Sequence, residues 1–126
     1  MEKFALIGKT LKHSYSKIIH EAFGKYAYDL ISITEDEIPS FLRNDEYTGF
    51  NVTIPYKQPI IPFCDDVSKE AKKIGSINTV VKKNGLIYGY NTDYAGFAAM
   101  SKRAGISFEG KKVAILGSGG TYKTSY

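Results

Sequence analysis

The sequence has a single cysteine, only two arginines and no long apolar run, and each shortage excludes a class of protein. Cys64 cannot form an internal disulfide and has no second cysteine with which to hold a metal. We therefore expect a reducing, cytoplasmic location and no metal site. No stretch approaches the roughly 18 apolar residues that a membrane-spanning helix needs, and the first ten residues lack the pattern of a secretory signal. We expect no membrane partner.

The shortage of arginine bears on nucleic-acid binding. The formal net charge is +4, but the basic residues are nearly all lysines, spread along the chain with acidic residues between them. Only Arg43 and Arg103 offer the planar guanidinium group that favours contacts with bases and phosphates. The charge therefore indicates a solvated lysine-rich surface, and we expect no nucleic-acid partner.

The chain does have the composition and the patterning of a folded domain. Its 126 residues are 43% hydrophobic and 24% charged, which suffices for one domain with one core. Strand patterns occur at residues 3–8, 28–33, 50–54 and 112–116, and a hairpin pattern occurs at 78–82 and 86–90 around the turn KKNG. Helical patterns occur at 16–26, 38–43, 68–74 and 92–105. This order predicts an α/β fold with a mostly parallel sheet, an antiparallel hairpin strand and helices on both faces.

Two local features refine these boundaries. Ser16 is placed to cap the first turn of the helix at 16–26, whose apolar residues recur on one face. Pro55 can start a further helix through Tyr56 and Lys57, which Pro59 and Pro62 should keep short or irregular. The sequence thus predicts that Lys57 projects from the first turn of a helix.

A glycine loop follows the last predicted strand. In VAILGSGG, at 113–120, Gly117 permits a tight turn, while Gly119 and Gly120 let backbone amides approach a pyrophosphate. Residues 117–124 also match the phosphate loop of nucleotide triphosphatases, except that Tyr122 stands where glycine precedes the lysine. Tyr122 disfavours that alternative and also occupies the third small position of the dinucleotide pattern. A complete βαβ unit needs about 30 residues, so we expect the chain to be part of a longer two-domain protein.

Four polar segments fall at predicted strand ends and loops, where open α/β sheets bind ligands. They are HSYS at 13–16, NVTIPYK at 51–57, SINT at 76–79 and NTD at 91–93. Each also has a purely structural interpretation. Ser16 and Asp93 are suited to cap helices, Asn78 to occupy a turn, and Lys57 to lie exposed as an ordinary lysine. If these segments meet, their hydroxyls, lysine and carboxylate suit a small acidic ligand and proton transfer.

Taken together, the segments resemble the amino-terminal part of the shikimate dehydrogenase family. The resemblance rests on five motifs in order: G-x-x-x-x-H-S-x-S at 8–16, GFNVTIPYK at 49–57, IGSINTV at 74–80, GYNTD at 89–93 and LGSGG at 116–120. It implies a substrate-binding α/β domain at 1–104, followed at 105–126 by the incomplete first strand and glycine loop of a Rossmann NADP-binding domain.

The resemblance also implies a reaction and a set of site residues. The reaction is the reversible, NADPH-dependent reduction of 3-dehydroshikimate to shikimate on the route to aromatic amino acids. Lys57 and Asp93 would form the catalytic pair. The substrate carboxylate would be held by Ser14, Ser16 and Thr53, and the ring hydroxyls by Asn78 and Asp93. The cofactor would contact Gly117, Ser118, Gly119, Gly120 and Thr121.

Several residues depart from the family pattern. Lys17 and Glu21 replace a proline and an asparagine beside the serines, Tyr94 stands where glycine often follows the aspartate, and Tyr122 replaces a small residue in the glycine loop. Two alternatives stay open, a quinate/shikimate dehydrogenase and a non-catalytic module that binds small acids. We also expect that the chain alone has no dehydrogenase activity, and we predict that the protein can form a homodimer.

Overall fold

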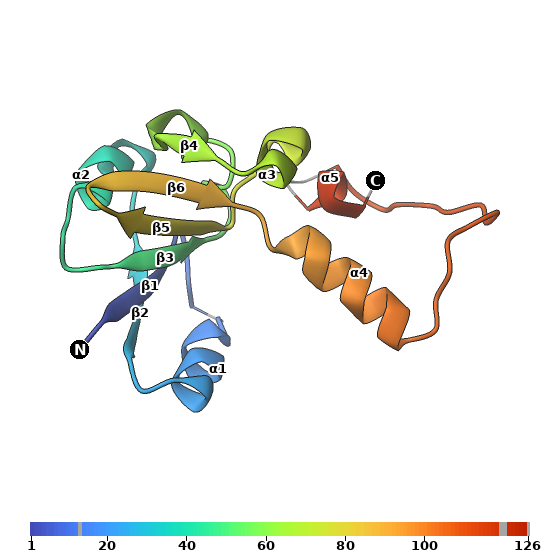
Figure 1. The fold of residues 1–126 in the computed structure, drawn as a ribbon, viewed down its shortest axis with the longest axis horizontal. Coiled ribbons are helices and arrows are strands. Elements are labelled where there is room, and N and C mark those ends of the chain that lie inside the picture. The colour runs from blue at the N-terminus through green and yellow to red at the C-terminus, as the bar shows by residue number, and fades with distance from the viewer. Residues whose placement is uncertain (13, 119–120, 126) are drawn as a thin grey trace.

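The structure is a computed structural model that describes residues 1–12, 14–118 and 121–125. Its helices and strands follow one another in the order shown in Figure 1. The strands are β1 (Lys3–Gly8), β2 (Ala27–Ser32), β3 (Gly49–Val52), β4 (Asp66–Val67), β5 (Thr79–Lys83) and β6 (Leu86–Tyr90). The α-helices are α1 (Ser16–Phe23), α2 (Ile38–Leu42), α3 (Lys69–Ile74), α4 (Asp93–Arg103) and α5 (Tyr122–Ser125), and two 3₁₀ helices span Glu35–Glu37 and Ile61–Phe63.

The strands form one sheet in the order β2-β1-β3-β5-β6-β4. β1 pairs in parallel with β2 and β3, and β4 pairs in parallel with β6. β5 runs antiparallel to both of its neighbours, β3 and β6. The predicted mostly parallel α/β sheet with an antiparallel hairpin strand is therefore confirmed. Because β5 alone is reversed, its amino end lies at the same edge of the sheet as the carboxyl ends of β1, β3 and β6.

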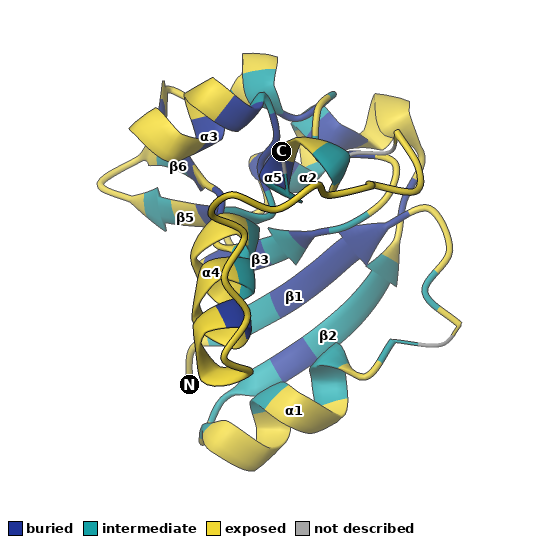
Figure 2. Cartoon of the chain, turned by 90° about the vertical axis from the view of Figure 1, so that its right-hand side faces the viewer, coloured by how far each residue is buried: buried dark blue, intermediate teal, exposed yellow. Residues whose placement is uncertain are grey.

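The hydrophobic core lies on one face of the sheet, and the strands β1 and β3 are its most buried part (Figure 2). Ala5 and Ile7 of β1 and Phe50 and Val52 of β3 alternate toward this face, as the two-residue period of a strand requires. α2, α3 and the segment between β3 and β4 cover them, through Ile38, Leu42, Tyr56, Ile60 and Ala71. This packing fixes the edge of the sheet from which the polar loops project.

α1 lies on the opposite face and confirms that helices occupy both faces, but its contacts differ from the prediction. Its apolar residues Ile18, Ile19 and Phe23 are 68%, 51% and 88% exposed, so the apolar face that their spacing predicts does not pack against the sheet. The helix is held instead by polar and aromatic contacts. The His20 ring stacks on Tyr28 of β2 at 4.0 Å, and the Lys17 ammonium donates to the Tyr28 carbonyl at 2.6 Å.

Two further predictions fail in the segments between and after the strands, and one short strand was not predicted. The helix expected from Pro55 does not form; residues 54–60 make successive turns, in which Tyr56 and Ile60 pack into the core. β4 has only two residues, too few to give a strand pattern. The strand expected at 112–116 is also absent, since no strand among the described residues lies beside it, and Val113 and Leu116 are 56% and 98% exposed.

The fold makes a prediction about alkaline pH. Burial raises the pKa of the Cys64 thiol from 9.0 to about 11, and burial raises the pKa of Tyr28 and Tyr47 from 10.0 to about 12. The folded chain therefore keeps these protons at a pH where the unfolded chain loses them, and stability is lost as pH rises from 9 to 12. We expect the urea midpoint to fall steadily across this range and to fall less at its lower end in Cys64→Ala. A midpoint that stays constant above pH 9 would contradict this prediction.

Within the described residues no helix is long and apolar enough to cross a membrane.

Candidate active site

The four polar segments meet at the sheet edge where β1, β3 and β6 end. The loop after β1 carries Ser14, Thr53 follows the last residue of β3, and Asp93 begins α4 three residues after β6. Asn78 immediately precedes β5, whose reversed direction brings its amino end to this edge. Sheet topology alone thus gathers residues that are as many as 79 positions apart, from Ser14 to Asp93.

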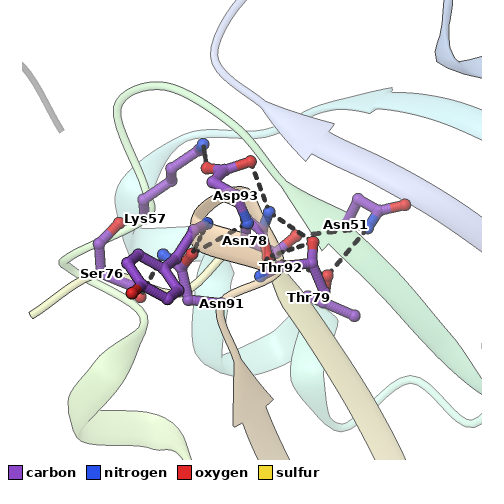
Figure 3. A network of polar contacts seen from close by, with 9 residues as sticks. Asn51, Lys57, Ser76, Asn78, Thr79, Asn91, Thr92 and Asp93 are labelled. Carbon is purple, nitrogen blue, oxygen red and sulfur yellow. Dashed lines mark hydrogen bonds and ion pairs between the residues drawn. The ribbon is translucent and has the colours of Figure 1, made fainter. Parts of the chain in front are cut away.

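Lys57 and Asp93 form an ion pair at the centre of this group, with 2.6 Å between Nζ and Oδ2 (Figure 3). Their side chains are 16% and 31% exposed, so both are largely shielded from water. The lysine is held in place through its backbone, because the Ile77 amide donates to the Lys57 carbonyl at 2.8 Å. Such a pair is strengthened by partial burial and can pass a proton to a ligand oxygen placed beside it.

Asp93 does not serve as the helix cap that its position suggested. The Asn91 side-chain oxygen accepts from the Asp93 backbone amide at 3.0 Å and so takes the capping role. The Asp93 carboxylate is therefore free for side-chain contacts. Its Oδ1 accepts from the Asn78 amide at 2.8 Å, while Oδ2 accepts from Lys57. Both oxygens accept hydrogen bonds, as in an ionised carboxylate.

A directed series of hydrogen bonds sets the orientation of Asn78 (Figure 3). The Tyr28 hydroxyl donates to Asn51 Oδ1 at 2.8 Å, so the Asn51 amide group turns toward Thr79 and donates to its hydroxyl at 3.2 Å. Thr79 donates to Asn78 Oδ1 at 3.0 Å, and the Thr92 backbone amide donates to the same oxygen. The Asn78 amide group is left to face Asp93, which fixes the carboxylate within the pocket.

The serine loop lies at the other side of the same pocket. Ser14 Oγ accepts from the Ser16 backbone amide at 3.2 Å, while Tyr15 occupies the N-cap position of α1 and makes no side-chain cap. The prediction that Ser16 caps the helix is therefore wrong, and the Ser16 hydroxyl is not used as a cap. Two hydroxyls next to the first amides of a helix can donate hydrogen bonds to a ligand carboxylate and orient it.

The pocket between these groups has a volume of about 650 Å³ and opens to solvent. All six residues predicted to catalyse or to bind substrate line it: Ser14, Ser16, Thr53, Lys57, Asn78 and Asp93. It is also lined by residues that the sequence did not single out as ligand-binding: Leu6, Thr10, Leu11, Lys12, His20, Asn51 and Val52. His20 could have been found, since it follows Ser16 by four residues and so shares its helix face.

Those predicted cofactor residues that the structure describes lie elsewhere. Gly117, Ser118 and Thr121 do not line this pocket, and Gly119 and Gly120 lie outside the described residues. Gly117 has φ 114°, a conformation that glycine adopts readily in a tight turn. Among the residues that the structure describes, no group of three or more histidine, cysteine, aspartate or glutamate side chains could hold a metal ion.

An open α/β sheet with an ion pair and a ring of hydroxyl and amide groups in a pocket at its carboxyl edge defines a domain that binds a small polar molecule. The chain belongs to the family of shikimate dehydrogenase substrate binding domains, whose model matches residues 6–80. That range contains every predicted substrate-binding residue except Asp93.

Individual relatives agree with this assignment. The chain is 42% identical to the shikimate dehydrogenase (NADP(+)) of Clostridium perfringens, over 98% of this chain and 49% of that protein. It superimposes on shikimate dehydrogenase 1 from Peptoclostridium difficile with a TM-score of 0.93 and 38% identity, over 99% of this chain and 49% of that one. The Thermus thermophilus enzyme in complex with NADP(H) and shikimate gives a TM-score of 0.88 and 33% identity, over 98% and 50%. The chain spans about half the length of the curated relatives it matches.

Proposed function

We propose that the chain is the substrate-binding part of an NADP-dependent shikimate dehydrogenase, which reduces 3-dehydroshikimate to shikimate reversibly. The observation that carries this proposal is the Lys57–Asp93 pair, 2.6 Å apart, in one pocket with the hydroxyls of Ser14, Ser16 and Thr53. The pair supplies a group for proton transfer, and the hydroxyls supply donors for a carboxylate at a separate point of the pocket. A hydroxylated ring acid needs both.

The chain's own residues account for the proton in this reaction. When the reacting hydroxyl of shikimate becomes a ketone, its proton must leave the oxygen as hydride leaves the carbon. Lys57 takes that proton after the ammonium of the ion pair has released its own proton to water, and it becomes an ammonium ion again beside the Asp93 carboxylate. Asn78 holds the other carboxylate oxygen, so the carboxylate does not turn away during the transfer. In the reverse direction the Lys57 ammonium returns the proton to the ketone oxygen.

The described residues 111–118 do not fit a bound dinucleotide. They form no strand ahead of the glycines, so the strand that precedes a bound pyrophosphate in this pattern is not formed. The choice of NADP is supported by the relatives, which are named as NADP(+) enzymes. Four other points stay predictions: the roles of Gly117, Ser118 and Thr121, the domain boundary at residue 104, a cytoplasmic location and a homodimer.

The proposal is tested by titrating shikimate into the isotope-labelled chain and recording backbone amide shifts by NMR. We expect saturable shifts at Ser14, Ser16, Thr53, Lys57, Asn78 and Asp93, with small shifts in α2, on the covered face of the sheet. Cyclohexene-1-carboxylate, which has the ring and the acid but no hydroxyls, is the matched control and should bind more weakly. A third titration, with quinate, compares the binding of quinate with that of shikimate and so tests the alternative of a quinate/shikimate dehydrogenase. Shikimate at millimolar concentration without shifts at these residues would contradict the proposal.

A further inference from the structure

The positive and negative charges of the lysine and carboxylate side chains that line the pocket do not cancel. Three of the described residues that line it carry an ammonium or a carboxylate group: Lys12, Lys57 and Asp93. Lys57 and Asp93 neutralise each other at 2.6 Å. Lys12 therefore leaves the pocket with one excess positive charge, which has no role in the proton transfer described above.

Lys12 differs from the other lysine that flanks the serines. The Lys17 ammonium is engaged, 2.9 Å from Glu21 Oε1 and 2.6 Å from the Tyr28 carbonyl oxygen. Among the described residues, no carboxylate lies within 4.0 Å of the Lys12 ammonium. Its charge is thus available to a ligand in the pocket.

The backbone holds the start of the loop that carries Lys12 close to Thr53. The loop leaves β1 at Gly8, where a Cβ atom would lie 2.6 Å from Thr53 Cγ2 and 2.9 Å from Leu11 Cδ2. Only glycine lets the loop approach this closely. The Lys9 amide also donates to the Ile54 carbonyl, at 3.4 Å. The described residues 8–11 are therefore held close to Thr53 and Ile54, and Lys12, which follows them, contributes to the pocket lining.

We propose that Lys12 selects anionic ring acids and turns their carboxylate toward Ser14, Ser16 and Thr53. This proposal rests on the proposed function, since it names how the same pocket distinguishes its substrate class. Serine and threonine hydroxyls donate hydrogen bonds to an acid, an ester or an amide alike. A free ammonium attracts only the anion, so it adds a discrimination that the hydroxyls do not provide.

The contribution should be modest and sensitive to salt. Lys12 is exposed, so water and dissolved ions screen its charge. Contacts between exposed charges change an equilibrium by a few-fold, and we expect about a three- to five-fold effect on the dissociation constant of the acid in low salt. Raising the salt concentration to about 0.5 M, where the Debye length is only a few Å, should remove most of this effect.

The test measures the dissociation constants of shikimate and of its methyl ester by NMR titration of the full chain. The variants are Lys12→Gln, Lys12→Arg and the matched control Lys9→Gln, which loses the same charge from the same loop outside the pocket lining. We expect Lys12→Gln to weaken shikimate binding about three- to five-fold at low salt without affecting the binding of the ester. Lys12→Arg keeps the charge and should bind shikimate as the unchanged chain does. Lys9→Gln should have little effect on either ligand.

The outcomes separate this proposal from the proposed function. Shikimate binding that is equally strong in Lys12→Gln would overturn the role of Lys12 and leave the proposed function in place. Equal weakening of acid and ester, or equal effects of Lys12→Gln and Lys9→Gln, would also overturn it, because the effect would then not come from a charge in the pocket. An unchanged chain that binds neither compound would overturn both proposals.

Discussion

Replacing Lys57 with methionine is expected to reduce shikimate oxidation by about 10²- to 10⁴-fold, the usual contribution of a general acid–base group. Methionine keeps a long flexible side chain but cannot carry a proton. The measurement uses a chimera in which residues 1–104 of this chain replace the corresponding part of the Clostridium perfringens enzyme, with NADP reduction followed by absorbance. Because Lys57 contacts Asp93 and not the serine loop, we expect the fall in kcat to exceed the change in KM.

Two controls make this result specific. Lys102→Met removes a lysine from α4 outside the pocket and should leave the rate within two-fold, since an exposed surface charge changes little. The 126-residue chain alone should show no activity above the blank. If Lys57→Met keeps full turnover in the chimera, the Lys57–Asp93 pair is not the proton-transfer group, and the pocket is better described as a binding module.

The largest effect on stability is expected at Tyr56, next to Lys57. The Tyr56 ring is 2% exposed in the core, and its hydroxyl donates to the Ile33 carbonyl at 2.7 Å. Truncation in Tyr56→Ala should cost about 3–5 kcal/mol through lost burial and the cavity that remains. Tyr56→Phe keeps the ring and leaves the Ile33 carbonyl without its donor, at a cost of about 1–3 kcal/mol. Urea unfolding followed by circular dichroism measures both.

The comparison with an exposed tyrosine identifies the cause. Tyr94 is 54% exposed, and Tyr94→Ala should change the free energy of unfolding by less than about 0.5 kcal/mol. Equal losses in Tyr56→Ala and Tyr94→Ala would show that core burial does not set the stability of this segment. Because Tyr56 anchors the turns that carry Lys57, its truncation should also weaken shikimate binding.

Where local chemistry decides the structure, the sequence was sufficient. α3 begins where Ser68 Oγ accepts from the Ala71 amide and ends at Gly75, which has φ 70°. The β5–β6 hairpin turns at Asn84 and Gly85, with φ of 54° and 74°, as an Asn-Gly pair between strands predicts. The segment after Pro55 could not be predicted in this way. Its prolines permit a helix start and also remove helix donors, and only tertiary packing decides between these.

The candidate site was predictable in part for the same reason. Ligand residues follow strand ends, and strands of one direction end at one edge, so a meeting of Thr53 and Asp93 could be expected from topology. The contact of Tyr28 with Asn51 could not, because it depends on the lateral order of β2, β1 and β3, which no local pattern encodes. The free ammonium of Lys12 was also missed, since its significance depends on which other lysines have carboxylate partners.

The reversed direction of β5 has a consequence for the order in which the site can assemble during folding. Asn78 and Asp93 are only 15 residues apart and are brought together by a single hairpin, so their contact closes a short loop at small entropic cost. Lys57 is 36 residues from the same aspartate in the sequence, so their contact closes a longer loop. Short-range contacts generally form faster than long-range ones. One local hairpin thus positions Asn78 and Asp93 and can form first. Lys57 reaches Asp93 later, when the parallel strands pair with this hairpin.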